Sequence, residues 1–172
     1  MYNVEFSRGQ MGCYLSHIKC YEDFLKTDYK YLIILEDDII IKENFKEDIN
    51  KLLSYLNKYN EIDFVYLSRS TIIMENQEMP TENKYKDDFI YSPQTCGYGF
   101  HSYLLTKDGC SKFLNILKNS ESMFNNGLAI PIDCLDRWLI LGNRMNINLN
   151  VYALRNELTK SYNYFSNTSE IL

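Results

Sequence analysis

A run of apolar residues over positions 31–41 is interrupted by three consecutive acids, Glu36, Asp37 and Asp38. The apolar stretch Tyr31–Leu35 is typical of a strand buried on both faces of a parallel sheet, where an unpaired carboxylate costs several kcal/mol of desolvation. We therefore expect the acids at the carboxyl end of that strand. Ligands of open α/β sheets bind there, and clustered carboxylates suit a hard divalent cation that carries a phosphorylated ligand.

Length and charge narrow the class of protein. The chain has 172 residues and a net charge of −5, which favours a single domain over residues 1–172 and argues against a nucleic-acid binder. No run of eighteen apolar residues and no charged-then-apolar leader is present, so we expect neither a transmembrane segment nor a signal peptide. These features predict a cytoplasmic protein, with attachment to the periphery of a membrane left open.

Five cysteines are present, and none forms a C-x-x-C pair. Their odd number and spacing disfavour a zinc knuckle and a complete disulfide framework, and we expect small buried apolar side chains instead. Cys13 and Cys20 fall on one predicted helix at a separation of about 10 Å, which is too far for a disulfide.

The first half of the chain alternates helix and strand. Apolar spacing predicts a helix from a Ser7–Gln10 capping box to Leu25, the strand Tyr31–Leu35, a helix from about Asn44, and a strand over Ile62–Leu67. The polar stretch 68–88 has no sustained periodicity and is predicted to be a long loop, of a length usually reserved for function or disorder.

The second half continues the pattern. Strands are expected over Phe89–Ser92 and Gly99–Leu105, joined as a hairpin by a turn at Gly97, followed by a helix capped by Thr106. A further helix is expected to begin near Pro131, with Gly142 just past its end. A half-buried final strand is expected around 147–151, with a polar tail over 155–172. This order predicts an α/β domain.

An ordered set of motifs resembles glycosyltransferase family 25, the lipopolysaccharide and collagen-type galactosyltransferases. The segment Gly-Cys-Tyr-Leu-Ser-His at 12–17 is followed by Ile-Leu-Glu-Asp-Asp at 34–38, and then by 97–99, 106–110 and 131–133. Together these motifs span residues 9 to about 138. A lone Glu-Asp-Asp would be a weak signal, whereas the ordered combination is fairly specific.

The resemblance implies a fold and an activity. The expected fold is GT-A-like and Rossmann-like, with a mixed, mostly parallel sheet flanked by helices. The expected reaction is transfer of a hexose, with galactose favoured, from a UDP-sugar donor to a glycan or hydroxylated acceptor. The family contains inverting enzymes, which implies a single displacement. A divalent cation, usually Mn²⁺ or otherwise Mg²⁺, is expected at the acidic motif.

The side chains of the three consecutive acids are expected to point in different directions. In a continuing strand, residues two apart point to the same side, so Glu36 and Asp38 are the candidate metal ligands and Asp37 faces the other way. A diphosphate leaving group needs such a cation, and oxygen ligands select Mg²⁺ or Mn²⁺. Asp37 is kept as a second catalytic candidate. The alternative is that the acids cap a strand end or pair with Arg69.

The acceptor hydroxyl also needs a carboxylate base on the face opposite the leaving group. Asp133 is the main candidate, because the dipole of the helix expected from Pro131 favours a carboxylate in its first turn. The alternatives are an ordinary helix-start aspartate or an ion pair with Arg137. Asp136 is a weaker catalytic candidate, since it lies one turn further along.

Donor contacts are expected from Gly97, Tyr98 and His17. Aromatic rings stack on sugar faces, although fifteen tyrosines make any single choice weak. His17 lies beside the apolar stripe of its helix, where it either touches the active site or makes a structural hydrogen bond. His101 falls in a predicted strand, away from the end where the resemblance would place chemistry.

The amino end departs from the family pattern, in which a strand, helix and strand that bind uridine usually precede the residue 12–17 motif. The fold is thus expected to be N-terminally shortened, and three explanations stay open: a fragment, a missing half supplied by another chain, or a relative with weakened donor binding. An exposed sheet edge would then favour a partner chain. A non-catalytic relative that binds a glycan or a partner is the alternative function. A phosphohydrolase fits less well, because its strand tip should read Asp-x-Asp.

Overall fold

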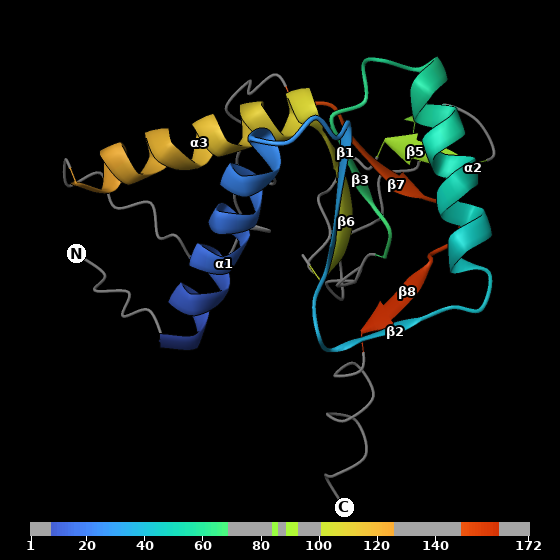
Figure 1. Cartoon of the computed structure of the whole chain (residues 1–172), viewed down its shortest axis with the longest axis horizontal. Coiled ribbons are helices and arrows are strands. Elements are labelled where there is room, and N and C mark those ends of the chain that lie inside the picture. Colours follow the sequence, from blue (N-terminus) through green and yellow to red (C-terminus); the bar gives the residue numbers. More distant parts are fainter. Residues whose placement is uncertain (1–7, 69–83, 86–88, 93–100, 126–148, 162–172) are drawn as a thin grey trace, which may run out of the picture.

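The computed structural model describes residues 8–68, 84–85, 89–92, 101–125 and 149–161. These residues form three layers (Figure 1). A six-stranded sheet lies in the middle, helices α1 and α3 pack on one of its faces, and helix α2 packs on the other. The α/β class expected from the order of elements is confirmed.

The three described helices begin close to the predicted positions, and α1 also ends at the predicted residue. They are α1 Arg8–Leu25, α2 Phe45–Lys58 and α3 Lys107–Asn125. The predicted cap of α3 is confirmed, because the Gly109 backbone N–H donates to the Thr106 hydroxyl oxygen at 3.1 Å. That bond satisfies one of the N–H groups that a helix start leaves without an intrahelical partner.

Six strands build the central sheet in the order β1-β6-β3-β7-β5-β4, and β2 pairs with β8 in a separate ladder. Their bounds are β1 Tyr31–Leu35, β2 Ile39–Ile41, β3 Phe64–Tyr66, β4 Lys84–Tyr85, β5 Ile90–Ser92, β6 Ser102–Thr106, β7 Val151–Leu154 and β8 Thr159–Ser161.

The prediction of a mostly parallel sheet is wrong. Among the described strands, β3 and β7 form the one parallel pair, and the other pairings are antiparallel. Strand β1 is also not a central strand. It is the outermost described strand on its side of the sheet and is half-buried, because it pairs with β6 alone. The partner chain predicted to cover a free sheet edge stays a prediction.

Two further expectations about strands are corrected. The predicted hairpin between residues 89–92 and 99–105 does not form, because β5 pairs with β4 and β7 while β6 pairs with β1 and β3. Part of the stretch predicted as a loop, Lys84–Tyr85, is strand β4, held by pairing with β5. The helix expected from Pro131 and the Ser7 cap lie outside the described residues.

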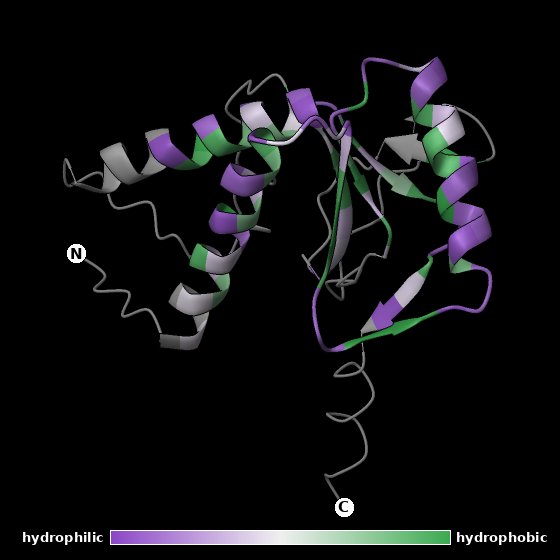
Figure 2. Ribbon diagram, viewed as in Figure 1, coloured by the Kyte–Doolittle hydropathy of each residue, from purple (hydrophilic) through white to green (hydrophobic). Residues whose placement is uncertain are grey.

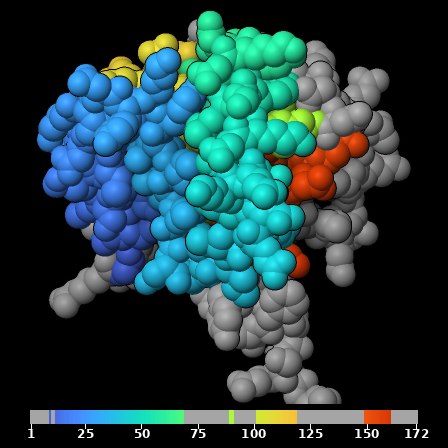
Figure 3. Space-filling view, turned by 45° about the vertical axis from the view of Figure 1, so that its right-hand side comes forward, coloured from blue at the N-terminus to red at the C-terminus, as the bar shows by residue number. Residues whose placement is uncertain are grey.

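The core divides into two clusters, one on each face of the sheet. Strand β3 shows the division, since successive side chains of a strand point to opposite faces. Phe64 and Tyr66 pack with residues of α1 and α3, whereas Val65 packs with residues of α2. Figure 3 shows that α2 forms much of the outer surface on its side of the molecule.

The ladder of β2 and β8 was not foreseen, because residues 155–172 were expected to be an irregular tail. Ile39 pairs with Ser161 and Ile41 pairs with Thr159. Figure 2 shows β2 as a hydrophobic strand, and Ile40 and Ile41 are 47% and 52% exposed. The apolar run of the sequence is therefore split into two strands with different surroundings.

The cysteines confirm the expectation of burial only in part. Cys110 is buried in the α1 and α3 cluster, and burial raises the pKa of its thiol to about 12. Cys13 and Cys20 share α1 as predicted, but both are exposed, which corrects the expectation that they are small core residues. None of the helices in the described ranges is long and apolar enough to cross a membrane.

Candidate functional site

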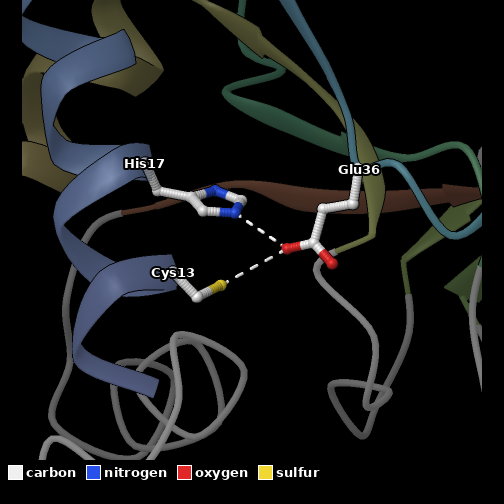
Figure 4. A group of neighbouring side chains, drawn as sticks. All are labelled: Cys13, His17 and Glu36. Carbon is white, nitrogen blue, oxygen red and sulfur yellow. Dashed lines mark hydrogen bonds and ion pairs between the residues drawn. The ribbon is translucent and has the colours of Figure 1, made fainter. Parts of the chain in front are cut away.

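The site is centred on Glu36, which immediately follows β1 as the sequence predicts. Its carboxylate points toward α1, where Cys13 and His17 lie one helical turn apart on the same face (Figure 4). His17 Nε2 lies 2.9 Å from Glu36 Oε1, and the Cys13 thiol donates to the same oxygen at 3.5 Å. The site therefore joins the amino-terminal half of α1 to the carboxyl end of β1.

Two buried tyrosines lie on the Nδ1 side of the His17 ring, away from Glu36. Tyr103 OH lies 2.5 Å from His17 Nδ1, and the hydroxyls of Tyr21 and Tyr103 contact each other. Burial raises the pKa of both phenols well above the ordinary value, so they remain neutral. An ionised Glu36 only accepts hydrogen bonds. His17 Nε2 therefore carries the proton on that side, and Tyr103 donates to Nδ1.

Strand pairing explains how Tyr103 reaches this place. Strand β6 runs antiparallel to β1, with Ile34 opposite Tyr103 and Leu35 opposite Ser102. The amino end of β6 thus meets the carboxyl end of β1. His17 makes structural hydrogen bonds, which was one of the two roles predicted for it. Its other predicted role, in donor binding, stays a prediction.

The same pairing corrects the prediction for His101. Because β6 is antiparallel to β1, His101 lies beside the acidic segment, and its carbonyl accepts a hydrogen bond from the Glu36 backbone N–H at 2.8 Å. Its side chain pairs with the Ser68 hydroxyl at 3.1 Å. The expectation that His101 lies away from the chemistry assumed the wrong strand direction.

Hydrogen bonding sets the charge of Glu36. The bond from His17 is the main cause that lowers the pKa of the Glu36 carboxyl, against the opposing effect of partial burial. The carboxylate form is thus favoured in the folded state.

Replacement of this carboxyl should have a pH-dependent effect on stability. Because the pKa of Glu36 is lower in the folded chain than in the unfolded chain, its contribution to stability is complete above the unfolded value. That contribution is lost as the pH falls through the folded value. We expect Glu36→Gln to lower the melting temperature at pH 7 and to differ less from the parent as the pH falls below about 4. Thermal melting curves of the parent and of Glu36→Gln across this pH range measure the difference in melting temperature. A difference that does not change with pH would contradict a lowered pKa for Glu36.

The other two acids differ in exposure. Asp37 is exposed in the turn between β1 and β2, whereas Asp38 is half-buried and its Oδ1 is shielded from solvent. Cys13 and His17 both contact Oε1 of Glu36, and Figure 4 shows Oε2 on the other side of the carboxylate. Convergence of Glu36 and Asp38 on a cation stays a prediction.

Several predicted site residues lie outside the described part of the chain. They are Gly97, Tyr98 and Asp133, together with the alternatives Arg69, Asp136 and Arg137. Sequence reasoning missed Cys13, Tyr21 and Tyr103. The four-residue spacing of Cys13 and His17 on one helix was the available signal for the first of these. Tyr103 gave none, because its place depends on strand pairing.

Comparison with known proteins identifies the family. Residues 1–135 match the family described as glycosyltransferase family 25 (LPS biosynthesis protein), and this range includes Cys13, His17, Glu36 and Asp133. The chain belongs to glycosyltransferase family 25. The resemblance stated from the motifs is confirmed.

The chain matches a different share of each family 25 relative. The chain is 30% identical over 131 residues to procollagen galactosyltransferase 1-B of Xenopus laevis, which is 74% of this chain and 19% of that protein. It is 27% identical over 108 residues to a glycosyltransferase 25 family member of Drosophila melanogaster, 62% of this chain and 16% of the relative.

A larger share of one bacterial relative is matched. The chain is 25% identical over 131 residues to the lipooligosaccharide biosynthesis protein lex-1 of Haemophilus influenzae, 71% of this chain and 42% of that protein. The family 25 chain thus spans less than half of the length of each of these three relatives.

Proposed function

We propose that the chain acts in a glycosyltransferase that moves a hexose, with galactose favoured, from a UDP-sugar to a glycan or hydroxylated acceptor. The observation that carries this proposal is the family 25 match over the segment that holds the site. Relatives named as a procollagen galactosyltransferase and a lipooligosaccharide biosynthesis protein support galactose and suggest the two acceptor classes.

The position of the acids supports the same activity. Glu36, Asp37 and Asp38 follow the end of β1, and the carboxyl ends of strands are where α/β folds bind phosphorylated ligands. We take the fold to be of the GT-A type. This assignment rests on the family and on the three-layer arrangement of helices and sheet.

Glu36 and Asp38 are the residues that would hold an Mn²⁺ or Mg²⁺ ion with the donor. The fit rests on two carboxylates on one turn, with Glu36 fixed through Oε1 by His17 while Oε2 faces away from α1. A bound cation would neutralise charge on the diphosphate. The chain's own part is to orient Glu36, which the bond from His17 and the hydroxyl of Tyr103 accomplish.

Asp133 is the proposed general base for the acceptor hydroxyl, and Asp37 is the second candidate. Deprotonation by a carboxylate opposite the leaving group gives inversion at the anomeric carbon in one displacement. The donor pocket is proposed to include Gly97 and Tyr98. All these roles are assigned on the match of this sequence to the family motifs.

Turnover tests the proposal. The purified chain is mixed with UDP-galactose or UDP-glucose, Mn²⁺, and either a hydroxylysine-containing collagen peptide or a lipooligosaccharide core, and product is followed by mass spectrometry. Asp38→Asn and Asp133→Asn should each reduce turnover about a hundredfold, as expected for loss of a group that stabilises transition-state charge or accepts a proton. Asp28→Asn, at an exposed aspartate between α1 and β1, is the matched control.

Two results would contradict parts of the proposal. Absence of product with every donor and acceptor, from a chain that still binds UDP-galactose, would indicate a binding module instead of a transferase. A product that retains the anomeric configuration of the donor, read by NMR, would exclude Asp133 as the base of a single displacement.

A further inference from the structure

Three side chains of different chemistry converge between α1 and β1. The ligand atoms of Cys13, His17 and Glu36 all lie within 4.8 Å of one another, and no other group of three such residues forms within the described ranges. Figure 4 shows the Cys13 sulfur and the His17 ring directed at the same carboxylate. The group offers one sulfur, one nitrogen and one oxygen atom.

This donor set differs from the oxygen-only set expected for a donor-bound Mn²⁺. Sulfur and imidazole ligands favour Zn²⁺, whereas Mg²⁺ and Mn²⁺ prefer carboxylates, carbonyls and water. Bond lengths of about 2.0–2.3 Å place the ligands of a tetrahedral Zn²⁺ roughly 3.3–3.8 Å apart. The observed separations from Glu36 Oε1 are 2.9 Å to His17 Nε2 and 3.5 Å to Cys13 Sγ, so only small side-chain movements are needed.

The surroundings resemble the support that metal-binding histidines usually have. A histidine ligand is commonly oriented by a hydrogen bond at its other ring nitrogen. Here His17 Nδ1 contacts the buried Tyr103 hydroxyl, and that hydroxyl also contacts the hydroxyl of Tyr21. On the opposite side, Cys13 is exposed, so an ion can enter from solvent while His17 stays buried.

We propose that Cys13, His17 and Glu36 form a binding site for a Zn²⁺-like cation, with the fourth position open to water. On binding, the Cys13 thiol releases its proton to solvent. His17 changes tautomer: Nε2 loses the proton that it donated to Glu36 and coordinates the ion, and Nδ1 gains a proton that it donates to the Tyr103 oxygen. The Tyr103 hydroxyl then donates to the Tyr21 oxygen. The ion would link α1 to the end of β1. This site goes beyond the proposed sugar transfer. It shares Glu36 and His17 with the proposed donor site, but the evidence for it is the geometry of Cys13, His17 and Glu36, which does not depend on sugar transfer.

Differential alkylation tests the site in the unmodified chain. Cys13 and Cys20 are both exposed on α1, and only Cys13 belongs to the group, so Cys20 is an internal control. With Zn²⁺ at about ten times its dissociation constant, labelling of Cys13 by iodoacetamide should slow about tenfold, because only the free form reacts. Labelling of Cys20 should not change. Equal rates at Cys13 with and without Zn²⁺, or equal slowing at both cysteines, would overturn the proposal.

Cobalt gives a second readout that does not depend on activity. Co²⁺ bound to a thiolate gives a sulfur-to-metal charge-transfer band in the near ultraviolet. We expect this band in the parent and in Cys20→Ser, and its loss in Cys13→Ser, with circular dichroism confirming that each variant is folded. A band that persists in Cys13→Ser would assign the thiolate to another cysteine and overturn the site.

The choice of metal is tested separately. In the absence of a UDP-sugar, Mn²⁺ at the same concentration as Zn²⁺ should leave the alkylation rate of Cys13 unchanged, since a thiolate and an imidazole discriminate against it. Protection of Cys13 by Mn²⁺ equal to that by Zn²⁺ would overturn the assignment to a Zn²⁺-like cation. A failed sugar-transfer assay would not alter either result.

Discussion

Replacing Gly109 by alanine should destabilise the chain by about 3 kcal/mol or more, lowering the melting temperature by roughly 10 °C. A Cβ atom at this position would lie 2.1 Å from the Asp63 carbonyl oxygen and 2.7 Å from its carbonyl carbon. That carbonyl oxygen also accepts a hydrogen bond from the Thr106 backbone N–H at 3.0 Å. The start of α3 must therefore move away from the residues that precede β3.

Gly12→Ala is the matched control for this substitution. Gly12 is also a helical glycine, but nothing lies within 4 Å of a Cβ atom placed there. Alanine at this position should stabilise α1 by about 0.5–1 kcal/mol through its helix propensity. Thermal unfolding followed by circular dichroism compares the two variants. A Gly109→Ala chain as stable as the parent would show that α3 is not seated as closely on Asp63 as described.

Replacing Lys112 by methionine should destabilise the chain by about 2 kcal/mol. Lys112 Nζ lies 2.8 Å and 2.9 Å from the two carboxylate oxygens of Asp63, and the Asn150 backbone N–H donates to one of them. The Asp63 side chain is only 3% exposed, so loss of the lysine leaves a buried carboxylate without its cation. Removing one partner of a fully buried pair costs about 3–5 kcal/mol, and the partial exposure of Lys112 reduces that value.

Lys118→Met, on the same helix, controls for loss of a positive charge. Lys118 pairs with Glu22, and the two side chains are 55% and 40% exposed. A pair of this kind contributes about 0–1 kcal/mol, so this variant should differ little from the parent. Urea unfolding gives the free energies. Equal effects at Lys112 and Lys118 would contradict a special role for Asp63, whereas Lys112→Arg should restore most of the loss.

Local features of the sequence predicted the helices well. The apolar stripe of α2 and the threonine cap of α3 depend on residues within a few positions of one another, which periodicity and capping rules capture. The sheet was predicted poorly, because strand order and direction depend on contacts between distant segments. The apolar composition of β1 indicated a buried parallel strand, yet among the described strands it pairs only with β6, in the antiparallel direction.

The candidate site also has a part that the sequence predicted and a part that it did not. The position of Glu36 at the end of β1 was predictable, because the apolar run of β1 ends there and an unpaired carboxylate is costly among apolar side chains. Its surroundings were not predictable. His17, which contacts Glu36, lies 19 positions away in sequence, and Tyr103, which contacts His17, lies 67 positions from Glu36. The packing of α1 and the register of β6 bring these residues together. The wrong prediction for His101 has the same origin.

Donor binding tests the central claim most directly. UDP-galactose is titrated calorimetrically into the purified chain with and without Mn²⁺, and into Asp38→Asn and Asp28→Asn under the same conditions. The proposed function predicts Mn²⁺-dependent binding by the parent and by Asp28→Asn that is weakened about a hundredfold in Asp38→Asn. A folded chain that gives no binding heat, or binding that is identical in Asp38→Asn, would contradict a donor site at the acidic segment after β1.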